Sequence, residues 1–320
     1  MQHYSATSIE DRLTYSKLAD AIRAAFLDAT ITAPTRMHLQ SGDSAQDAVL
    51  VMPAWRRGGL GVVKVVTVRP ANALRNMPSV QGTALLFDEA SGVPVATVDA
   101  TALTRWRTAA TSLLAARYLA RPTSTVLAMF GSGAMARHLI HAYASEFPLR
   151  TVLIWSRSED HARRLATKLE LPQSVDIVVT TDRESAGRQA HIISCATMAE
   201  AALVGGSWVQ PGTHVDLVGA FTPHMRESDD RLVECAQIYV DTRAAALKEA
   251  GDLVQPLRAG VISASDILGE LADIVRGPFP LRRTDTAITV FKSVGHSIED
   301  LAAAELLIGA AGSVGVSRET

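Results

Sequence analysis

A glycine-rich turn gives the clearest chemical signal in this sequence of 320 residues. Gly131, Gly133 and Ala136 follow the apolar run 126–130 at the spacing G-x-G-x-x-A and begin an amphipathic stretch. Gly131 permits a tight turn, Gly133 lets the backbone approach a pyrophosphate, and Ala136 allows close packing of helix on strand. The first turn of such a helix offers unpaired N–H groups to phosphates. We therefore expect a dinucleotide site here, whose other residues are Ser132, Ala134 and Met135.

The residues after the next predicted strand, 151–155, indicate which dinucleotide binds. A carboxylate at this position would hold the ribose 2′-hydroxyl of NAD. The sequence has Ser156, Arg157 and Ser158 instead, and a guanidinium with two hydroxyls suits a 2′-phosphate. We predict that NADPH is preferred over NADH; the alternative is that Arg157 lies on the adenine of an NAD enzyme.

Lys64 is a charged residue within the almost wholly apolar run 61–68. Strand alternation puts it on the same face as Val62 and Val66. A buried ammonium needs a partner or has a lowered pKa, so Lys64 is a candidate acid–base group or carboxylate anchor. The alternative is an outward, solvated lysine.

Three further side chains have suitable chemistry for a small acidic substrate. Arg36 and His38 share a face if their segment is extended, and Arg107 lies on a predicted helix. A guanidinium fork suits a carboxylate, and histidine can relay protons near neutral pH. A structural histidine and two exposed arginines are the alternative reading.

These residues need a scaffold, and the middle of the chain predicts one. Short β-branched runs there alternate with helix-like segments such as 134–146 and 158–169. Apolar strands separated by helices are typical of a parallel sheet covered on both faces. We predict an α/β fold with a Rossmann doubly wound domain at 120–297, whose strands are 126–130, 151–155, 175–180, 191–195, 214–218 and 238–240.

The first third of the chain has a different pattern. A helix near 16–30 precedes strands that are separated by close turns at Gly58-Gly59 and Ser91-Gly92, which suits a mixed or antiparallel sheet. We predict a smaller α+β domain at 1–119 that binds substrate and forms a homodimer, since such a sheet must cover its outer face or edge. The C-terminal residues 298–320 are expected to complete it. The predicted elements are strands at 47–53, 61–68, 83–88 and 93–99 and helices at 101–119 and 298–311.

Composition narrows the class of protein. The net charge is −2 and the basic residues are scattered, so we expect no nucleic-acid partner. We also expect no membrane span, no signal peptide and no metal site, because the apolar runs are short and the nine histidines lack zinc spacing. Two cysteines predict no disulfide framework and a cytoplasmic protein.

Taken together, several blocks resemble the ornithine cyclodeaminase/mu-crystallin family. They run in family order over nearly the whole chain, which makes the resemblance far more specific than the glycine turn. The blocks are VKVVTVRPAN at 63–72, PSVQG at 78–82, TALTRWRTAA at 101–110, GSGAMA at 131–136, VGAFTPHMRE at 218–227, TVFKSVG at 289–295 and EDL at 299–301. The resemblance implies a Rossmann domain plus a dimerising substrate domain built from both chain ends.

The resemblance also implies roles for individual residues. Arg36 and Arg107 match positions that bind the substrate carboxylate, and Lys64 matches a lysine that contacts the substrate beside the nicotinamide. Ser79 falls where cyclodeaminases carry a pocket threonine. The matching or expected cofactor-proximal residues are Thr108, Ala196, Thr197, Lys292, Ser293 and Val294.

One departure bears on the reaction. Cyclodeaminases resemble one another in an aspartate that engages the amine of ornithine, and Phe221 stands at the corresponding position here. Phenylalanine cannot pair an ammonium but packs on an apolar ring. The blocks MPAW at 52–55 and PSVQG at 78–82 are similar to the reductase branch.

We therefore expect NADPH-dependent reduction of a cyclic imino acid, with Δ1-pyrroline-2-carboxylate to L-proline as the leading case and Δ1-piperideine-2-carboxylate as a further substrate. Lys64 and His38 are the expected catalytic residues, with Arg36, Arg107, Ser79 and Phe221 around the substrate. The alternatives are an ornithine cyclodeaminase with NAD as internal oxidant, an alanine or opine-type dehydrogenase, and a non-catalytic mu-crystallin-like binding protein.

Overall fold

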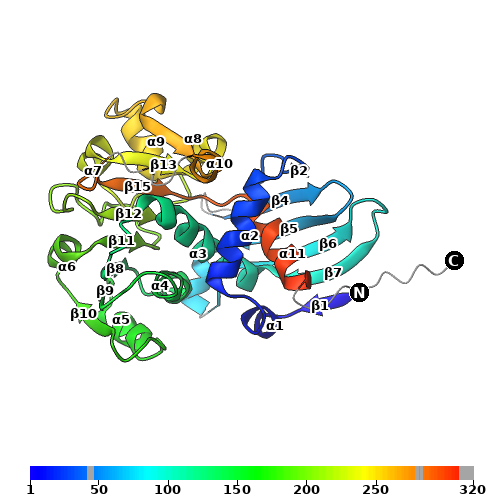
Figure 1. The fold of residues 1–320 in the computed structure, drawn as a ribbon, viewed down its shortest axis with the longest axis horizontal. Helices are drawn as coiled ribbons and strands as arrows, with labels where there is room; N and C mark the ends of the chain where they lie inside the picture. The colour runs from blue at the N-terminus through cyan, green and yellow to red at the C-terminus, as the bar shows by residue number, and fades with distance from the viewer. Residues whose placement is uncertain (42–46, 76, 278–280, 282–283, 310–320) are drawn as a thin grey trace. The chain divides into compact units, whose positions relative to one another are not determined.

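The computed structural model describes residues 1–41, 47–75, 77–277, 281 and 284–309, and it divides into two compact units. The first unit comprises residues 1–108 and 296 onward, and the second comprises 109–295 (Figure 1). The sequence predicted this junction after residue 119, whereas the two units meet after residue 108; both positions lie in helix α3 (Ala100–Leu119). Residues 310–320 of the predicted C-terminal completion lie outside the described residues.

The first unit is built on a mixed sheet in the strand order β1-β7-β6-β5-β4-β2, with β3 paired to β4. β1 is parallel to β7, and the other pairs are antiparallel. The sequence predicted four of these strands and missed β1, β2 and β3, which are too short to show a period. The bounds are β1 Gln2–Tyr4, β2 Ile31–Thr32, β3 Met37–Gln40, β4 Ala48–Arg56, β5 Leu60–Val68, β6 Val80–Asp88 and β7 Pro94–Asp99.

Helices cover one face of this sheet. Helix α11 (Ser297–Gly309) contacts α2 (Tyr15–Leu27) and strands β4 and β5, and Figure 1 shows α11 over the strands with α2 beside it. The face under α11 carries Val62, Lys64 and Val66 of β5, and all three are buried. Short segments complete this unit: α1 (Ala6–Glu10) and the 3-10 turn η1 (Pro70–Arg75).

Helix α3 (Ala100–Leu119) runs through the boundary between the units. The carboxylate of Asp99 accepts hydrogen bonds from the backbone N–H groups of Thr101 and Ala102, at 2.9 and 3.0 Å, and so caps the start of α3. Arg107 lies just before the boundary. Among the described residues, no helix is both long and apolar enough to cross a membrane.

The second unit contains a parallel sheet in the order β10-β9-β8-β11-β12-β15-β13-β14. This order confirms the predicted doubly wound fold. The sequence missed β14 and β15, because each is four residues long and contains a charged residue or a glycine. The bounds are β8 Val126–Phe130, β9 Thr151–Trp155, β10 Asp176–Thr180, β11 Ile192–Cys195, β12 His214–Leu217, β13 Gln237–Val240, β14 Ile267–Glu270 and β15 Thr289–Lys292.

Polar caps start several helices of this unit. Asp182 caps α6 (Arg183–Gln189) and Asp229 caps α7 (Asp230–Cys235), each by accepting a backbone N–H of the first turn. Helix α4 differs, because its N-cap residue is Gly133, which has no side chain to cap the helix. The remaining elements are α4 Ala134–Ala144, α5 Glu159–Ala166, α8 Arg243–Glu249, α9 Gly251–Arg258, η2 Ala264–Asp266 and α10 Leu271–Arg276.

Candidate cofactor and substrate sites

The glycine turn lies between β8 and α4 in the second unit. Gly131 has a φ angle of 117°, a conformation that side chains rarely adopt, and a Cβ here would lie 2.8 Å from the carbonyl oxygen of Ala196. Its N–H donates to the carbonyl of Trp155 at 2.8 Å. Glycine is therefore required at 131 by both backbone conformation and space.

Gly133 differs from Gly131, because its φ of −76° is ordinary and nothing lies within 4 Å of the position its Cβ would take. The backbone at the start of α4 is thus open, and its first N–H groups have no side-chain cap. The chain continues from β8 to β9 and β10 on one side, then crosses to β11 and β12 on the other. The carboxyl end of β8 is therefore the topological switch point, where doubly wound sheets bind dinucleotides. The residues present fit a dinucleotide.

The end of β9 carries the residues predicted to read the ribose. Ser132 in the glycine turn donates a hydrogen bond to the hydroxyl of Ser156 at 2.8 Å, so the two loops are joined. Arg157 is exposed. Ser158 caps α5 by accepting the N–H of His161, which engages its hydroxyl.

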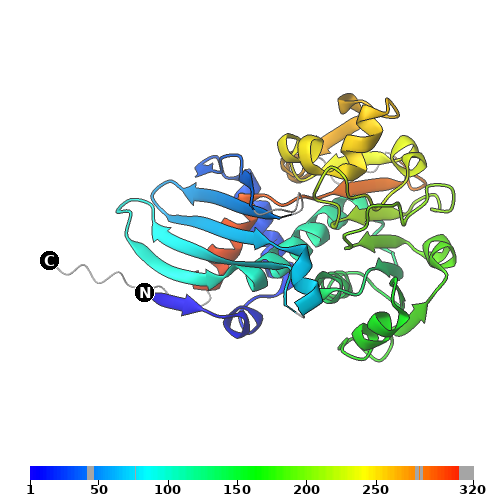
Figure 2. The ribbon, with the colours of Figure 1, turned by 180° about the vertical axis from the view of Figure 1, so that it is seen from behind.

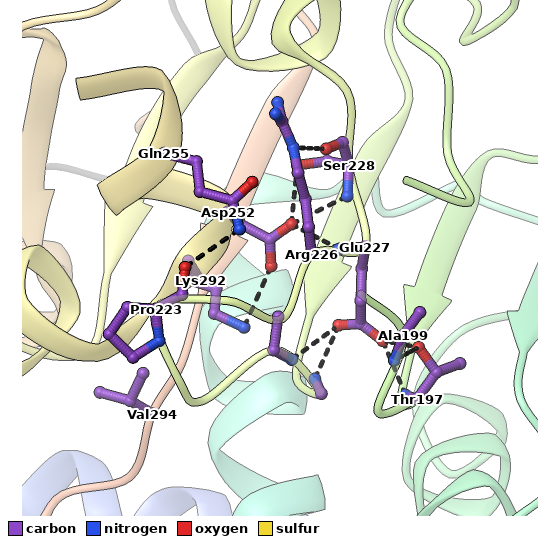
Figure 3. A network of polar contacts seen from close by, with 12 residues as sticks. Thr197, Ala199, Pro223, Arg226, Glu227, Ser228, Asp252, Gln255, Lys292 and Val294 are labelled. Atoms are coloured by element: carbon purple, nitrogen blue, oxygen red, sulfur yellow. Dashed lines mark hydrogen bonds and ion pairs between the residues drawn. The ribbon is translucent and has the colours of Figure 1, made fainter. Parts of the chain in front are cut away.

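Most of the other predicted cofactor contacts lie after β11 and at the end of β15. The N–H and hydroxyl of Thr197, next to Ala196, both donate to the carboxylate of Glu227. Lys292 is fully buried, and its Nζ lies 3.4 Å from Oδ2 of Asp252 (Figure 3). Its charge therefore faces the interior. Ser293 is buried and the N–H of Val294 donates to Asp241, so contact of this loop with a cofactor stays a prediction.

Lys64 lies on the buried face of the first unit's sheet, as strand alternation predicts. Its side chain is 1% exposed, and its Nζ donates to Oδ1 of Asp300 on α11 at 2.6 Å and to the hydroxyl of Thr104 on α3 at 3.3 Å. Burial, followed by the charge of Arg107, lowers the pKa of Lys64 to about 8, while Asp300 acts in the opposite direction. An ammonium with a pKa near 8 is suited to giving a proton at neutral pH.

Arg107 joins the same cluster from α3. Its Nε donates to Oδ1 of Asp300 at 3.2 Å and its Nη1 to Oε2 of Glu299 at 2.7 Å. Asp300 thus accepts from both cations. Its other oxygen, Oδ2, is buried and has no hydrogen-bond partner among the described residues. The cluster of Lys64, Arg107, Glu299 and Asp300 brings two cations and two anions together in the interior of the first unit.

Two other predicted substrate residues, His38 and Arg36, lie in or next to β3. His38 on β3 is exposed; it lies opposite Leu50, which lies opposite Val66, so His38 shares the sheet face of Lys64. Arg36 is half-buried just before β3. His38 therefore lies on the same side of the sheet as Lys64, whereas Arg36 precedes the paired residues.

Three predicted residues are distributed over both units. Ser79 is half-buried before β6, and its carbonyl accepts the N–H of Arg69 at 2.7 Å. Thr108 is buried on α3, directly after Arg107. Phe221 is half-buried after β12, in the second unit.

Sequence reasoning missed the acidic partners. Glu299 and Asp300 are completely buried although they are adjacent acids, and they precede the mostly apolar remainder of α11. That pattern is the signal that could have found them, because charged residues are almost never fully buried unless paired. Glu227 and Asp252 lie in loops and helix starts with no comparable signal.

Solved structures with the same fold define the class of protein. One is a Δ1-pyrroline-2-carboxylate reductase from Thermococcus litoralis in complex with NADH and L-proline, with a TM-score of 0.92, 30% identity and 97% of each chain covered. Another is an archaeal alanine dehydrogenase dimer with bound NAD, with a TM-score of 0.89, 26% identity, and 97% of this chain and 96% of that chain covered. With the glycine turn, these findings define an oxidoreductase that uses a nicotinamide cofactor.

The family follows from the sequence comparisons. The model of the ornithine cyclodeaminase/mu-crystallin family matches residues 2–313. A Δ1-pyrroline-2-carboxylate reductase from Paracoccus denitrificans is 42% identical over 250 residues, which cover 78% of each protein. The chain belongs to the ornithine cyclodeaminase/mu-crystallin family.

Proposed function

We propose that the protein reduces a cyclic imino acid with NADPH, with Δ1-pyrroline-2-carboxylate to L-proline as the leading case and Δ1-piperideine-2-carboxylate as a further substrate. The observation that carries the proposal is Lys64, a buried ammonium whose pKa is lowered to about 8 and which is hydrogen-bonded to Asp300 beside Arg107. The similarity to two Δ1-pyrroline-2-carboxylate reductases supports this substrate class.

In this proposal Arg107 binds the substrate carboxylate. Its guanidinium has donors in a fixed fork, and Glu299 and Asp300 hold that fork through Nη1 and Nε. Arg36 is the second proposed carboxylate ligand, and Ser79 and Phe221 are proposed to line the pocket. Holding the carboxylate fixes the position of the adjacent imine carbon, which removes part of the entropic barrier.

Lys64 is the proposed acid. A bound reduced nicotinamide supplies the hydride that adds to the imine carbon. Lys64 gives a proton from Nζ to the imine nitrogen, which balances that addition and yields the secondary amine. The neutral amine of Lys64 then regains its proton from solvent, with His38 as the proposed relay.

The preference for NADPH rests on the end of β9. Ser156 and Arg157 replace the carboxylate that would bind an unmodified ribose, and the hydroxyl of Ser156 is held by Ser132. Gly131 and Gly133 are proposed to contact the pyrophosphate, with Ser132, Ala134 and Met135 beside them. Thr108, Ala196, Thr197, Ser293 and Val294 are the other proposed contacts.

We also propose that the first unit forms a homodimer through the outer face of its sheet. Val65 is 40% exposed although it is flanked by buried Lys64 and Val66, and Met37 and Leu85 are exposed on the same face. In the view of Figure 2, no described helix of this unit crosses that face. A related solved structure is a dimer. Light scattering should show a dimer for the wild type and a monomer for Val65→Asp, and a monomeric wild type would contradict this.

The experiment that tests the function follows NADPH oxidation with a panel of compounds. The panel contains Δ1-pyrroline-2-carboxylate, Δ1-piperideine-2-carboxylate, pyruvate with ammonia, and ornithine. We expect turnover with a cyclic imino acid and formation of the corresponding amino acid. Release of ammonia from ornithine without net NADPH consumption would contradict the proposal and indicate a cyclodeaminase.

A further inference from the structure

A single buried carboxylate joins the loops that follow β11 and β12. Oε1 of Glu227 accepts the N–H and the hydroxyl of Thr197, both at 2.7 Å. Oε2 accepts the N–H of Gly219 at 2.7 Å and that of Ala220 at 3.3 Å. Four donors from two loops therefore meet at one side chain, which has no exposed surface (Figure 3).

The two loops are in direct contact at this point. A Cβ on Gly219 would lie 1.9 Å from the carbonyl oxygen of Thr197 and 2.5 Å from Oε1 of Glu227. Only glycine permits this approach, so the sequence preserves the space that Glu227 needs to reach both loops.

A second buried carboxylate supports the first. Oδ1 of Asp252 on α9 accepts the N–H groups of Glu227 and Ser228, each at 2.8 Å, and the hydroxyl of Ser228 at 3.0 Å. Its Oδ2 pairs with Nζ of Lys292 at the end of β15, and all three charged groups are buried. Two carboxylates and one ammonium leave one negative charge in excess when all three are ionised.

The position of this cluster in the sheet relates it to the cofactor. The glycine turn follows β8, the predicted ribose residues follow β9, and β11 and β12 lie on the other side of β8. A dinucleotide crosses a doubly wound sheet at the switch point, so its adenosine half lies over β9 and its nicotinamide half over β11 and β12. The oxidised nicotinamide ring carries a positive charge and the reduced ring carries none.

We propose that Glu227 is a positioning residue for the nicotinamide end of the coenzyme, and that its buried negative charge strengthens binding of the oxidised coenzyme relative to the reduced one. The inference rests on the proposed function only in requiring a nicotinamide coenzyme; it holds for any substrate. In this proposal the loops after β11 and β12 position the nicotinamide ring, and the negative charge of Glu227 favours the oxidised ring over the reduced one.

The protonation of Glu227 provides a second test of the proposal. Burial, reinforced by Asp252 and opposed by Lys292, raises the pKa of Glu227 to about 7. Cys195 of β11 faces the same cluster, and burial raises the pKa of its thiol well above the ordinary value, which keeps it neutral. Glu227 is therefore ionised at pH 8.5 and protonated at pH 6, and the relative affinity for the oxidised coenzyme should weaken as the pH falls.

Another buried acid of the same unit provides a matched control. Asp216 on β12 accepts hydrogen bonds from Ser112, Tyr143 and Ser194 at 2.8 to 3.0 Å, and burial raises its pKa to about 6. It lies within a strand and contacts neither loop through these bonds. Asp216→Asn therefore reproduces the loss of a buried carboxylate without removing the link between the loops.

The experiment measures the dissociation constants of NAD⁺ and NADH, and of NADP⁺ and NADPH, for the wild type, Glu227→Gln and Asp216→Asn. Because each ratio of oxidised to reduced compares two ligands on the same folded protein, loss of folded protein cancels. We expect the ratio of the dissociation constants, oxidised over reduced, to rise about fivefold or more at pH 8.5 in Glu227→Gln, as for the loss of one partly screened charge. The same ratio should change less than about twofold in Asp216→Asn. As the pH falls from 8.5 to 6, the ratio of the dissociation constants, oxidised over reduced, should rise in the wild type and in Asp216→Asn but stay constant in Glu227→Gln.

An unchanged ratio in Glu227→Gln at pH 8.5 would overturn the proposal. If that variant fails to fold, the wild-type pH series decides, and a ratio that is constant from pH 8.5 to 6 overturns it equally. A wild type that binds none of the four coenzymes contradicts the proposed function instead.

Discussion

Asp300 is the residue whose replacement tests the electrostatics of the substrate site most sharply. Its Oδ1 accepts hydrogen bonds from Lys64 at 2.6 Å and from Arg107 at 3.2 Å, and all three side chains are buried. Asp300→Asn removes the negative charge while it keeps an oxygen that can accept one of these bonds. The two cations are then left beside each other with Glu299 as the remaining carboxylate of the cluster.

The size of the effect follows from the balance around Lys64. Burial and Arg107 lower the pKa of Lys64, and Asp300 is the first of the groups that raise it. An adjacent opposite charge is worth about 1–3 pKa units, so the pKa of Lys64 in the variant should fall from about 8 by that amount. Because Lys64 must be protonated to act as the acid, the rate falls as the pH rises through its pKa. The alkaline limb of the pH profile should therefore move to lower pH by about 1–3 units.

Stability should also fall, because removing one partner of a buried ion pair leaves the other uncompensated. The expected loss is about 3 kcal/mol or less, since the asparagine oxygen still accepts a hydrogen bond. The control is Glu305→Gln, which removes a carboxylate from the same helix, α11, where it pairs with Arg56 at 2.7 Å. The assay is kcat/KM for the imino acid from pH 4.5 to 10. An alkaline limb in Asp300→Asn that coincides with those of the wild type and the control would show that Asp300 does not set the pKa of Lys64.

Three further variants test other parts of the account. Ser156→Asp should shift the ratio of kcat/KM for NADPH and NADH at least about tenfold toward NADH, because a carboxylate repels the 2′-phosphate and binds the free ribose; an unchanged ratio would remove Ser156 from coenzyme selection. Gly131→Ala should raise the coenzyme dissociation constant by about tenfold or more, because its Cβ would lie 2.8 Å from the carbonyl oxygen of Ala196. The control is Gly260→Ala, whose Cβ would have no atom within 4 Å and which should bind the coenzyme as the wild type does. Arg107→Lys keeps the charge but loses the fork to Glu299 and Asp300, so KM for the imino acid should rise by about tenfold or more; a wild-type KM would exclude Arg107 as the carboxylate ligand.

Much of the fold could be predicted because its signals are local. The runs 126–130 and 151–155 correspond to β8 and β9 as observed, since short apolar runs bounded by turn residues are typical of buried strands. β15 could not be predicted, because its four residues become a strand only by pairing with β12 and β13, which are distant in sequence. β3 could not be predicted either, because its four residues are too few to show a period and all of them are exposed.

The site shows the same limit. Lys64 could be placed on the buried face because alternation within one strand suffices. Its partner Asp300 is 236 positions away, and only the tertiary fold brings α11 onto β5. Glu227 could not be found either, because its role depends on the contact between two loops that Gly219 permits.

The most direct test of the central claim is the rate of imine reduction in Lys64→Met, measured together with coenzyme binding. We predict that turnover of the cyclic imino acid falls by about 10²- to 10⁴-fold while the dissociation constant for NADPH stays within about twofold of the wild type. Lys17→Met, which removes an exposed lysine from α2, is the control and should retain full activity. Wild-type turnover in Lys64→Met would contradict the account, because it would show that Lys64 does not supply the proton.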